Sequence, residues 1–173
     1  MTTIVAVRRN GHTAIAGDGQ VTGGEKVIMK GTAEKIRPIY GGKVVVGFAG
    51  GVADAVTLQD WFEKKLELFQ GNLQRSAVAL AQDWRKDSTM QKLQAMLIAM
   101  DGKDLLLVSG NGEVIAPDED VLAIGSGGNF AQAAAVALIR HTEMDASAIA
   151  KEAVGIASGI DIFTNEHIKV SEL

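Results

Sequence analysis

Chemistry could begin at the second residue, because Met1 is followed by Thr2 and then by an apolar run. Methionine before a small residue is a substrate for removal, which would leave Thr2 with a free α-amine. Such an amine has an unperturbed pKa of about 7.7–8.0, so part of it is unprotonated near neutral pH and can act as a base. One residue would then supply both nucleophile and base, which most hydrolases assemble from two side chains. An ordinary chain start before an ordinary strand would have the same sequence. Residues elsewhere in the chain must therefore show whether Thr2 is a nucleophile.

Four further positions carry groups that an N-terminal threonine would need. Asp18 lies between two glycines at a predicted strand end, and Lys35 precedes another predicted strand, where alternation puts it on one face with Arg37, and Ile36 on the other. Residues 47–51 form a strand-to-helix junction, where unpaired N–H groups can stabilise a developing negative charge. Residues 124–128 form a second junction, with Ser126 on a sharp turn. Taken singly, each has a common structural explanation, since aspartates in glycine turns bond their own backbone and surface lysines are solvated.

Composition narrows the class of protein. The 173 residues are 47% hydrophobic and 22% charged with a net charge of −4, which fits a single domain over residues 1–173 and argues against a nucleic-acid or anionic-membrane surface. The absence of cysteine excludes disulfides, zinc–thiolate sites and a cysteine nucleophile. No apolar run is long enough to span a bilayer, and Arg8 and Arg9 interrupt the first one. We therefore expect no signal peptide and a cytoplasmic location.

Short apolar runs separated by turn signals predict many strands. Strands at 3–9 and 13–17 flank the hairpin signal Asn10-Gly11, and Asn111-Gly112 is a second signal of this kind. Further strands are expected at 26–29, 36–40, 44–48, 95–100, 105–109, 114–115, 121–124, 161–163 and 168–170.

Apolar residues at helical spacing predict four helices, at 52–70, 73–84, 130–140 and 146–158. Asn72 and Asp145 can cap the second and the fourth. The third is alanine-rich and apolar nearly all round, so it is buried on several sides or lies at a subunit contact. Segregated strands and helix pairs indicate an α+β fold in which helices cover antiparallel sheets.

In order along the chain, these segments resemble the HslV (ClpQ) family of bacterial proteasome-like protease subunits, relatives of the proteasome β-subunits. The blocks that carry the resemblance are Thr2-Thr3-Ile4-Val5, Gly17-Asp18-Gly19-Gln20, Met29-Lys30-Gly31, Lys35-Ile36-Arg37, Gly47-Phe48-Ala49-Gly50-Gly51, Asp83-Trp84-Arg85, Asn111-Gly112, Ala123-Ile124-Gly125-Ser126-Gly127-Gly128 and Thr164-Asn165. They extend from one end of the chain to the other, and their combination is highly specific.

The resemblance implies an N-terminal-nucleophile (Ntn) hydrolase fold, a four-layer αββα sandwich of two antiparallel sheets between helix pairs, with threonine endopeptidase activity. Carried over by position, Thr2 would be the nucleophile once the preceding methionine is removed, and its amine the general base. Lys35 would lower the pKa of the Thr2 hydroxyl or amine, and Asp18 would hold Lys35 charged and oriented. Ser126 would hydrogen-bond near the Thr2 amine, and the Gly50 N–H would bind the oxyanion.

The resemblance also implies a cation and partners. Family members hold a sodium ion in the loop after the last helix, at positions that match Ser158, Asp161 and Thr164; backbone carbonyls are the expected ligands, since oxygen suits a hard cation. They form two stacked six-membered rings with internal active sites, bind hexameric AAA+ ATPase rings (HslU, or ClpY) that unfold protein substrates, and act in the stress response. The third helix and Trp61-Phe62 are candidate subunit surfaces. Residues 47–51 lack the ending of a phosphate loop, so we expect no nucleotide site in this chain.

Two departures from the family pattern leave alternatives open. The segment 20–29 is one residue longer than in enterobacterial members, and Glu34 stands where a second lysine is common. Lys30 or Lys26 could therefore take the role given to Lys35. Lys35, however, keeps the sequence spacing to the glycine block at 47–51 that the family pattern has. Two other functions also remain: an Ntn amidohydrolase that acts on a small amide without an ATPase partner, and a non-catalytic proteasome-like subunit. Retention of the first methionine would disable the site.

Overall fold

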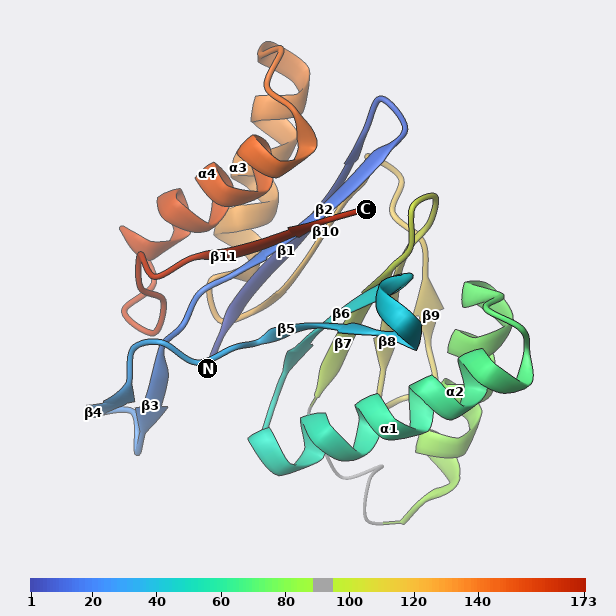
Figure 1. Ribbon diagram of the computed structural model, residues 1–173. Coiled ribbons are helices and arrows are strands. Elements are labelled where there is room, and N and C mark those ends of the chain that lie inside the picture. Colours follow the sequence, from blue (N-terminus) through green and yellow to red (C-terminus); the bar gives the residue numbers. More distant parts are fainter. Residues whose placement is uncertain (89–94) are drawn as a thin grey trace.

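Two stacked antiparallel sheets lie between two pairs of helices in the computed structural model, which describes residues 1–88 and 95–173 (Figure 1). The first sheet has the order β10 (Val121–Gly125), β1 (Thr3–Arg9), β2 (His12–Gly17), β11 (Lys169–Glu172). The second has the order β5 (Ile36–Ile39), β6 (Val44–Ala49), β7 (Met96–Met100), β8 (Leu105–Ser109), β9 (Val114–Ile115). A separate two-stranded ribbon pairs β3 (Val21–Gly23) with β4 (Val27–Lys30).

Residues of β1 alternate between two cores, as expected of a strand covered on both faces. Ile4 and Ala6 are buried between the two sheets. Val5 and Val7 point the other way, into a core with α3 (Gly128–His141) and α4 (Ala146–Ser158). A third core lies on the far face of the second sheet, under α1 (Val52–Leu68) and α2 (Leu73–Lys86). These cores separate four layers, so the predicted αββα sandwich is confirmed (Figure 1).

The helix starts follow the predicted caps. The Asn72 side chain accepts a hydrogen bond from the Arg75 N–H at 2.9 Å, and the Asp145 side chain accepts one from the Ala148 N–H at 2.7 Å. Each satisfies a donor that the first helical turn leaves without a partner. The strand boundaries also agree with prediction to within about two residues, except at two places.

The predicted strand at 161–163 is wrong. Asp161 donates its N–H to the Ala157 carbonyl at 2.8 Å, and its own carbonyl accepts from the Thr164 N–H at 3.0 Å. These bonds turn the chain at the end of α4 and leave no partner strand for the apolar residues there. The short strand β3 was not predicted, because its residues carry no alternating apolar pattern.

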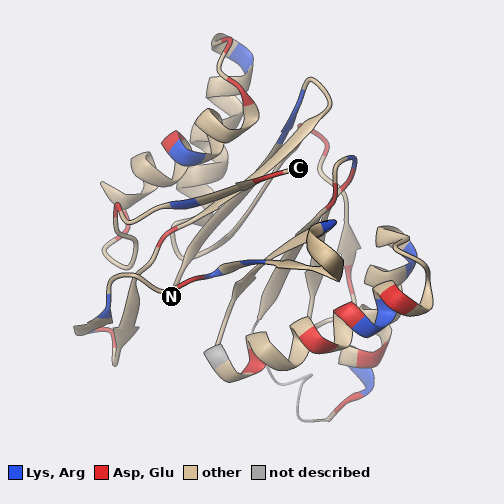
Figure 2. Cartoon of the chain, viewed as in Figure 1, with Lys and Arg blue, Asp and Glu red and all other residues tan. Residues whose placement is uncertain are grey.

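The predicted subunit surfaces have different outcomes. Phe62, on the inner face of α1, is fully buried in the core that α1 covers, and Trp61 is partly buried at the edge of the same core. The α3 helix packs on the first sheet and on α4 and leaves Phe130 exposed, so within this chain it is not buried all round, and the subunit contact stays a prediction. Figure 2 shows that α3 is nearly free of charge, whereas acidic and basic side chains alternate along α1 and α2.

Among the helices that the structure describes, none has the length and apolar character needed to cross a membrane.

Candidate active site

The pairing of β1 with its two neighbours gathers the predicted site at one end of the first sheet. Thr3 lies opposite Gly125 on β10, and the next residue of β1 lies opposite the last residue of β2. Asp18, which follows β2, and Ser126, which follows β10, therefore flank the start of β1. Thr2 is only 6% exposed at this position. The register of β1 with β2 and with β10 thus brings three residues from distant parts of the sequence together.

Asp18 is the centre of the hydrogen bonds around the start of β1. Its Oδ1 accepts from the Lys35 Nζ at 2.7 Å and from the Thr3 N–H at 2.9 Å, and its Oδ2 accepts from the Gln20 N–H at 2.9 Å. A buried carboxylate with several donors is stabilised in its charged form. Asp18 therefore fixes both the strand that begins with the threonines and the lysine beside it.

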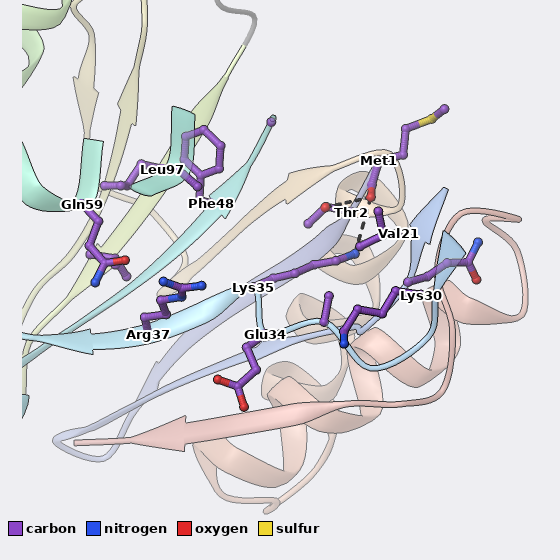
Figure 3. A pocket seen from close by; sticks show the side chains of 15 residues that line it. Met1, Thr2, Val21, Lys30, Glu34, Lys35, Arg37, Phe48, Gln59 and Leu97 are labelled. Atoms are coloured by element: carbon purple, nitrogen blue, oxygen red, sulfur yellow. Dashed lines mark hydrogen bonds between the residues drawn. The ribbon is translucent and has the colours of Figure 1, made fainter. Parts of the chain in front are cut away.

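Lys35 reaches the same corner from the residue before β5. Its Nζ donates to Asp18 and to the Met1 carbonyl at 3.4 Å (Figure 3). Burial lowers the pKa of Lys35 below its usual value, and the charge and hydrogen bond of Asp18 oppose this decrease. Lys30 lines the same pocket but is exposed, and Lys26 is exposed in the β3–β4 turn, so the geometry favours Lys35 over both alternatives.

Ser126 belongs to a network that the sequence did not predict. Its Oγ donates to Asp161 Oδ2 at 2.8 Å and lies 3.4 Å from the Thr2 carbonyl oxygen. Thr164 Oγ1 donates to the same Asp161 oxygen at 2.5 Å and lies 2.6 Å from Thr3 Oγ1. Because the single hydroxyl proton of Thr164 goes to Asp161, Thr3 is the donor in the last contact. The side chain of Asp161 therefore orders Ser126 directly and Thr3, the first residue of β1, through Thr164, and no spacing in the sequence signals this.

Two glycines let the β10–α3 turn approach the start of β1. Gly125 has φ +94°, and a Cβ there would lie 1.8 Å from the Thr2 carbonyl oxygen. A Cβ on Gly127 would lie 2.1 Å from Thr3 Oγ1. Real side chains never approach so closely, so glycine at both positions is required for the observed position of Thr2.

A pocket of about 420 Å³ opens beside Thr2 and extends along the face of the second sheet that α1 covers (Figure 3). Its walls include Thr2, Lys35 and Gly50, so the residue predicted to supply the oxyanion donor borders the same space as the predicted nucleophile. Apolar side chains of β6, β7 and α1 line the deeper part; they are Val46, Phe48, Ala55 and Leu97. A Cβ on Gly50 would lie 2.7 Å from the Phe48 ring, which explains the small residue at this position. The pocket can hold an apolar side chain of a bound peptide next to the threonine.

The predicted cation loop lies next to this site. Ser158 ends α4, and the loop then passes through Asp161 and Thr164, both of which are buried. The Asp161 carbonyl accepts one hydrogen bond, from the Thr164 N–H, and keeps a second lone pair. Within the described residues, no hydrogen bond reaches the carbonyls of Ser158 or Thr164. Three oxygen acceptors with spare capacity in one tight loop fit a hard monovalent cation.

The fold and the threonine at the start of β1 define a proteasome-type threonine hydrolase. The family model described as proteasome subunit matches residues 1–173. The chain is 73% identical to the ATP-dependent protease subunit HslV of Lacticaseibacillus casei over 171 residues, 98% of each chain. It is 59% identical to HslV of a Thermoanaerobacter species over 172 residues, 99% of this chain and 98% of the relative.

Solved structures agree. The crystal structure of HslV from Trypanosoma brucei matches with a TM-score of 0.94 and 46% identity over 99% of both chains. A protein from Thiobacillus denitrificans, BPH, matches with a TM-score of 0.75 at 20% identity over 99% of this chain and 97% of its own, which supports the fold alone. The chain belongs to the proteasome-subunit family, within its HslV branch, and is an N-terminal threonine protease.

Proposed function

We propose that this chain is the proteolytic subunit of a two-component ATP-dependent protease, and that Thr2 cleaves peptide bonds after Met1 is removed. One observation carries the assignment of Thr2. The Thr2 hydroxyl donates to the Met1 carbonyl at 2.8 Å, and the Lys35 Nζ donates to the same oxygen at 3.4 Å. Loss of Met1 therefore leaves the hydroxyl, the lysine and the new α-amine facing one space beside the pocket.

In the proposed reaction, Thr2 Oγ attacks the carbonyl carbon of the scissile peptide and its proton passes to the Thr2 α-amine, directly or through a water. The Lys35 charge favours the unprotonated amine and the developing alkoxide. The Gly50 N–H donates to the oxyanion of the tetrahedral intermediate. Collapse breaks the C–N bond, the protonated α-amine gives its proton to the leaving amine, and an ester on Thr2 remains. Water, deprotonated by the same amine, hydrolyses this ester and restores the hydroxyl.

The remaining predicted residues hold this arrangement in place. Asp18 keeps Lys35 charged and oriented, and Ser126 lies where it can hydrogen-bond the free amine while Asp161 fixes its hydroxyl. A sodium ion on the carbonyls of Ser158, Asp161 and Thr164 would supply positive charge that orders the loop next to Ser126.

Self-association is supported by two exposed apolar surfaces. The first is a groove between α3 and α4 that is lined almost wholly by carbon, with Phe130, Leu138, Ile156 and Ile160 among its residues. The second is the β3–β4 ribbon, where Val27, Ile28 and Met29 are 62%, 63% and 74% exposed. Exposed apolar patches of this kind are typical of subunit contacts. They fit the proposed assembly of two stacked hexameric rings that enclose the threonines.

The names of the HslV relatives describe subunits of ATP-dependent proteases, which implies a separate ATPase. We propose a hexameric AAA+ unfoldase of the HslU (ClpY) type, which binds the nucleotide and delivers unfolded protein substrates. The complex would act in the cytoplasm during the stress response.

Intact mass and peptidase activity of the purified protein test this function, with a Thr2→Ala variant alongside. We expect the mass of the chain without Met1, and activity that is absent in Thr2→Ala. Retained Met1, or activity that survives in Thr2→Ala, would contradict the mechanism. Addition of the ATPase should increase degradation of an unfolded protein; hydrolysis of small amides that is indifferent to the ATPase would indicate an Ntn amidohydrolase instead.

A further inference from the structure

Asn165 joins three parts of the molecule at the back of the Asp18–Lys35 pair. It follows Thr164 in the loop between α4 and β11 and is half-buried. Its side-chain Oδ1 accepts from the Gly19 N–H at 3.1 Å, and its Nδ2 donates to the Gly31 carbonyl at 2.9 Å. Its backbone N–H lies 3.4 Å from Asp18 Oδ2. Both ends of one amide thus connect the segment that carries Asp18 to the segment that leads to Lys35.

The two segments also approach each other directly. The Ala33 N–H donates to the Gly19 carbonyl at 2.9 Å. A Cβ on Gly19 would lie 2.5 Å from the Gly31 carbonyl oxygen, so the two backbones are almost in contact. The Asp18–Lys35 pair itself and the β3–β4 pairing of Val21 with Lys30 also link the two segments, and the Asn165 amide adds a further link through its own two bonds. Asn165 is therefore one of the contacts that set how closely the two segments approach each other.

We propose that Asn165 is a positioning residue that holds Asp18 and Lys35 at ion-pair distance. The inference rests on the proposed roles of Asp18 and Lys35 beside Thr2, and adds a residue that acts on the reaction only through them. Asparagine suits this role because it presents one acceptor and one donor from the same planar group. Aspartate keeps the acceptor but has no donor for the Gly31 carbonyl, and alanine has neither.

The test compares Asn165→Ala and Asn165→Asp with the wild type in the mature enzyme that has lost Met1. Asn111→Ala is the matched control, because Asn111 is exposed in the β8–β9 turn, far along the chain from the site. Peptidase kcat and KM, the pH profile of kcat/KM and the melting temperature are measured for each. We expect Asn165→Ala to lower kcat by about tenfold to a hundredfold, as displacements of about 1 Å do, with KM within about twofold of wild type.

The pH profile separates positioning from general stability. With Asp18 held less closely, Lys35 loses part of the interaction that favours its charged form. We therefore expect the alkaline limb of kcat/KM to move to lower pH in Asn165→Ala and not in Asn111→Ala. Asn165→Asp preserves the size of the side chain, so it still tests whether Asn165 positions the pair if the alanine variant fails to fold. We expect Asn165→Asp to show the same loss of kcat.

A kcat and an alkaline limb equal to wild type in the folded variants would overturn the proposal. A Lys35→Ala variant, measured in parallel, distinguishes this failure from failure of the proposed function. If Lys35→Ala is inactive while the Asn165 variants behave like the wild type, the role of Asn165 is refuted and the role of Lys35 stands. Full activity in Lys35→Ala would refute the role of Lys35, and with it the reason for positioning that side chain.

Discussion

The Lys35 Nζ lies 2.7 Å from Asp18 Oδ1, and the two side chains are 8% and 0% exposed. A lysine so far withdrawn from water remains charged only while its carboxylate partner is present. The pair reaches the site from two different sheets, since Asp18 follows β2 and Lys35 precedes β5. Packing of one sheet on the other is therefore what brings the lysine to the threonine.

Asp18→Asn should abolish peptidase activity and destabilise the fold. The substitution leaves Lys35 buried without an opposite charge, which costs about 3–5 kcal/mol in comparable buried pairs. Urea unfolding and peptide hydrolysis measure the two effects. Asp120→Asn is the control, because it removes a partly exposed ion pair with Arg8 and should cost no more than about 1 kcal/mol. Equal losses in the two variants would show that the Asp18–Lys35 pair has no special importance.

Activity should fall at alkaline pH as Lys35 loses its proton. Burial lowers the pKa of Lys35, so the alkaline limb of kcat/KM should lie below 10.5, the ordinary value for lysine. The sign for stability is opposite: between the folded pKa and 10.5 the unfolded chain binds more protons, so the free energy of unfolding rises with pH across that window. A pH profile to about pH 11 checks the first statement. A Lys35→Arg variant that remains active should lack this limb, because arginine stays protonated in that range.

Gly125→Ala should inactivate the protein by displacing Thr2. The new methyl group would lie 1.8 Å from the Thr2 carbonyl oxygen, at a φ of +94° that alanine rarely adopts. The chain must move at the start of β1, where the nucleophile lies. Gly102→Ala is the control, because no atom lies within 4 Å of a Cβ at that position. Peptidase assays and labelling of Thr2 with an electrophilic peptide would measure the difference, and normal labelling of Gly125→Ala would contradict the prediction.

Local patterns predicted much of this structure. The Asn10-Gly11 signal gives the β1–β2 hairpin because both residues adopt positive φ, 52° and 79°, as a tight turn between twisted strands requires. Asn72 and Asp145 cap the helices they were predicted to cap. These features depend on a few adjacent residues, so the sequence contains all the information needed.

Features that depend on packing could not be predicted in this way. Residues 161–163 were predicted as a strand, yet Ile162 is exposed and Asp161 turns inward to Ser126 and Thr164. The reason is that α4 ends beside the β10–α3 turn, which is a property of the assembled layers. The role of Asn165 is hidden for the same reason, because its partners lie more than 130 residues away in the chain.

Ala55→Phe should change which peptides are cleaved. Ala55 lies on the second turn of α1 and faces the pocket beside Thr2, together with Val46, Phe48 and Leu97. A phenyl group there would fill part of the roughly 420 Å³ that a substrate side chain would occupy. Loss of the space for about one methylene group lowers kcat/KM by about tenfold to two-hundredfold. We therefore expect kcat/KM for peptides with leucine before the scissile bond to fall by a factor in that range.

Peptides with alanine at that position should be cleaved about as well as by the wild type, since a small side chain does not reach the new ring. The ratio of the two kcat/KM values is the measurement. Ala53→Phe serves as control, because Ala53 is exposed on the same helix and does not line the pocket. An unchanged ratio in Ala55→Phe would mean that substrate side chains bind elsewhere, and that this pocket does not set the cleavage preference.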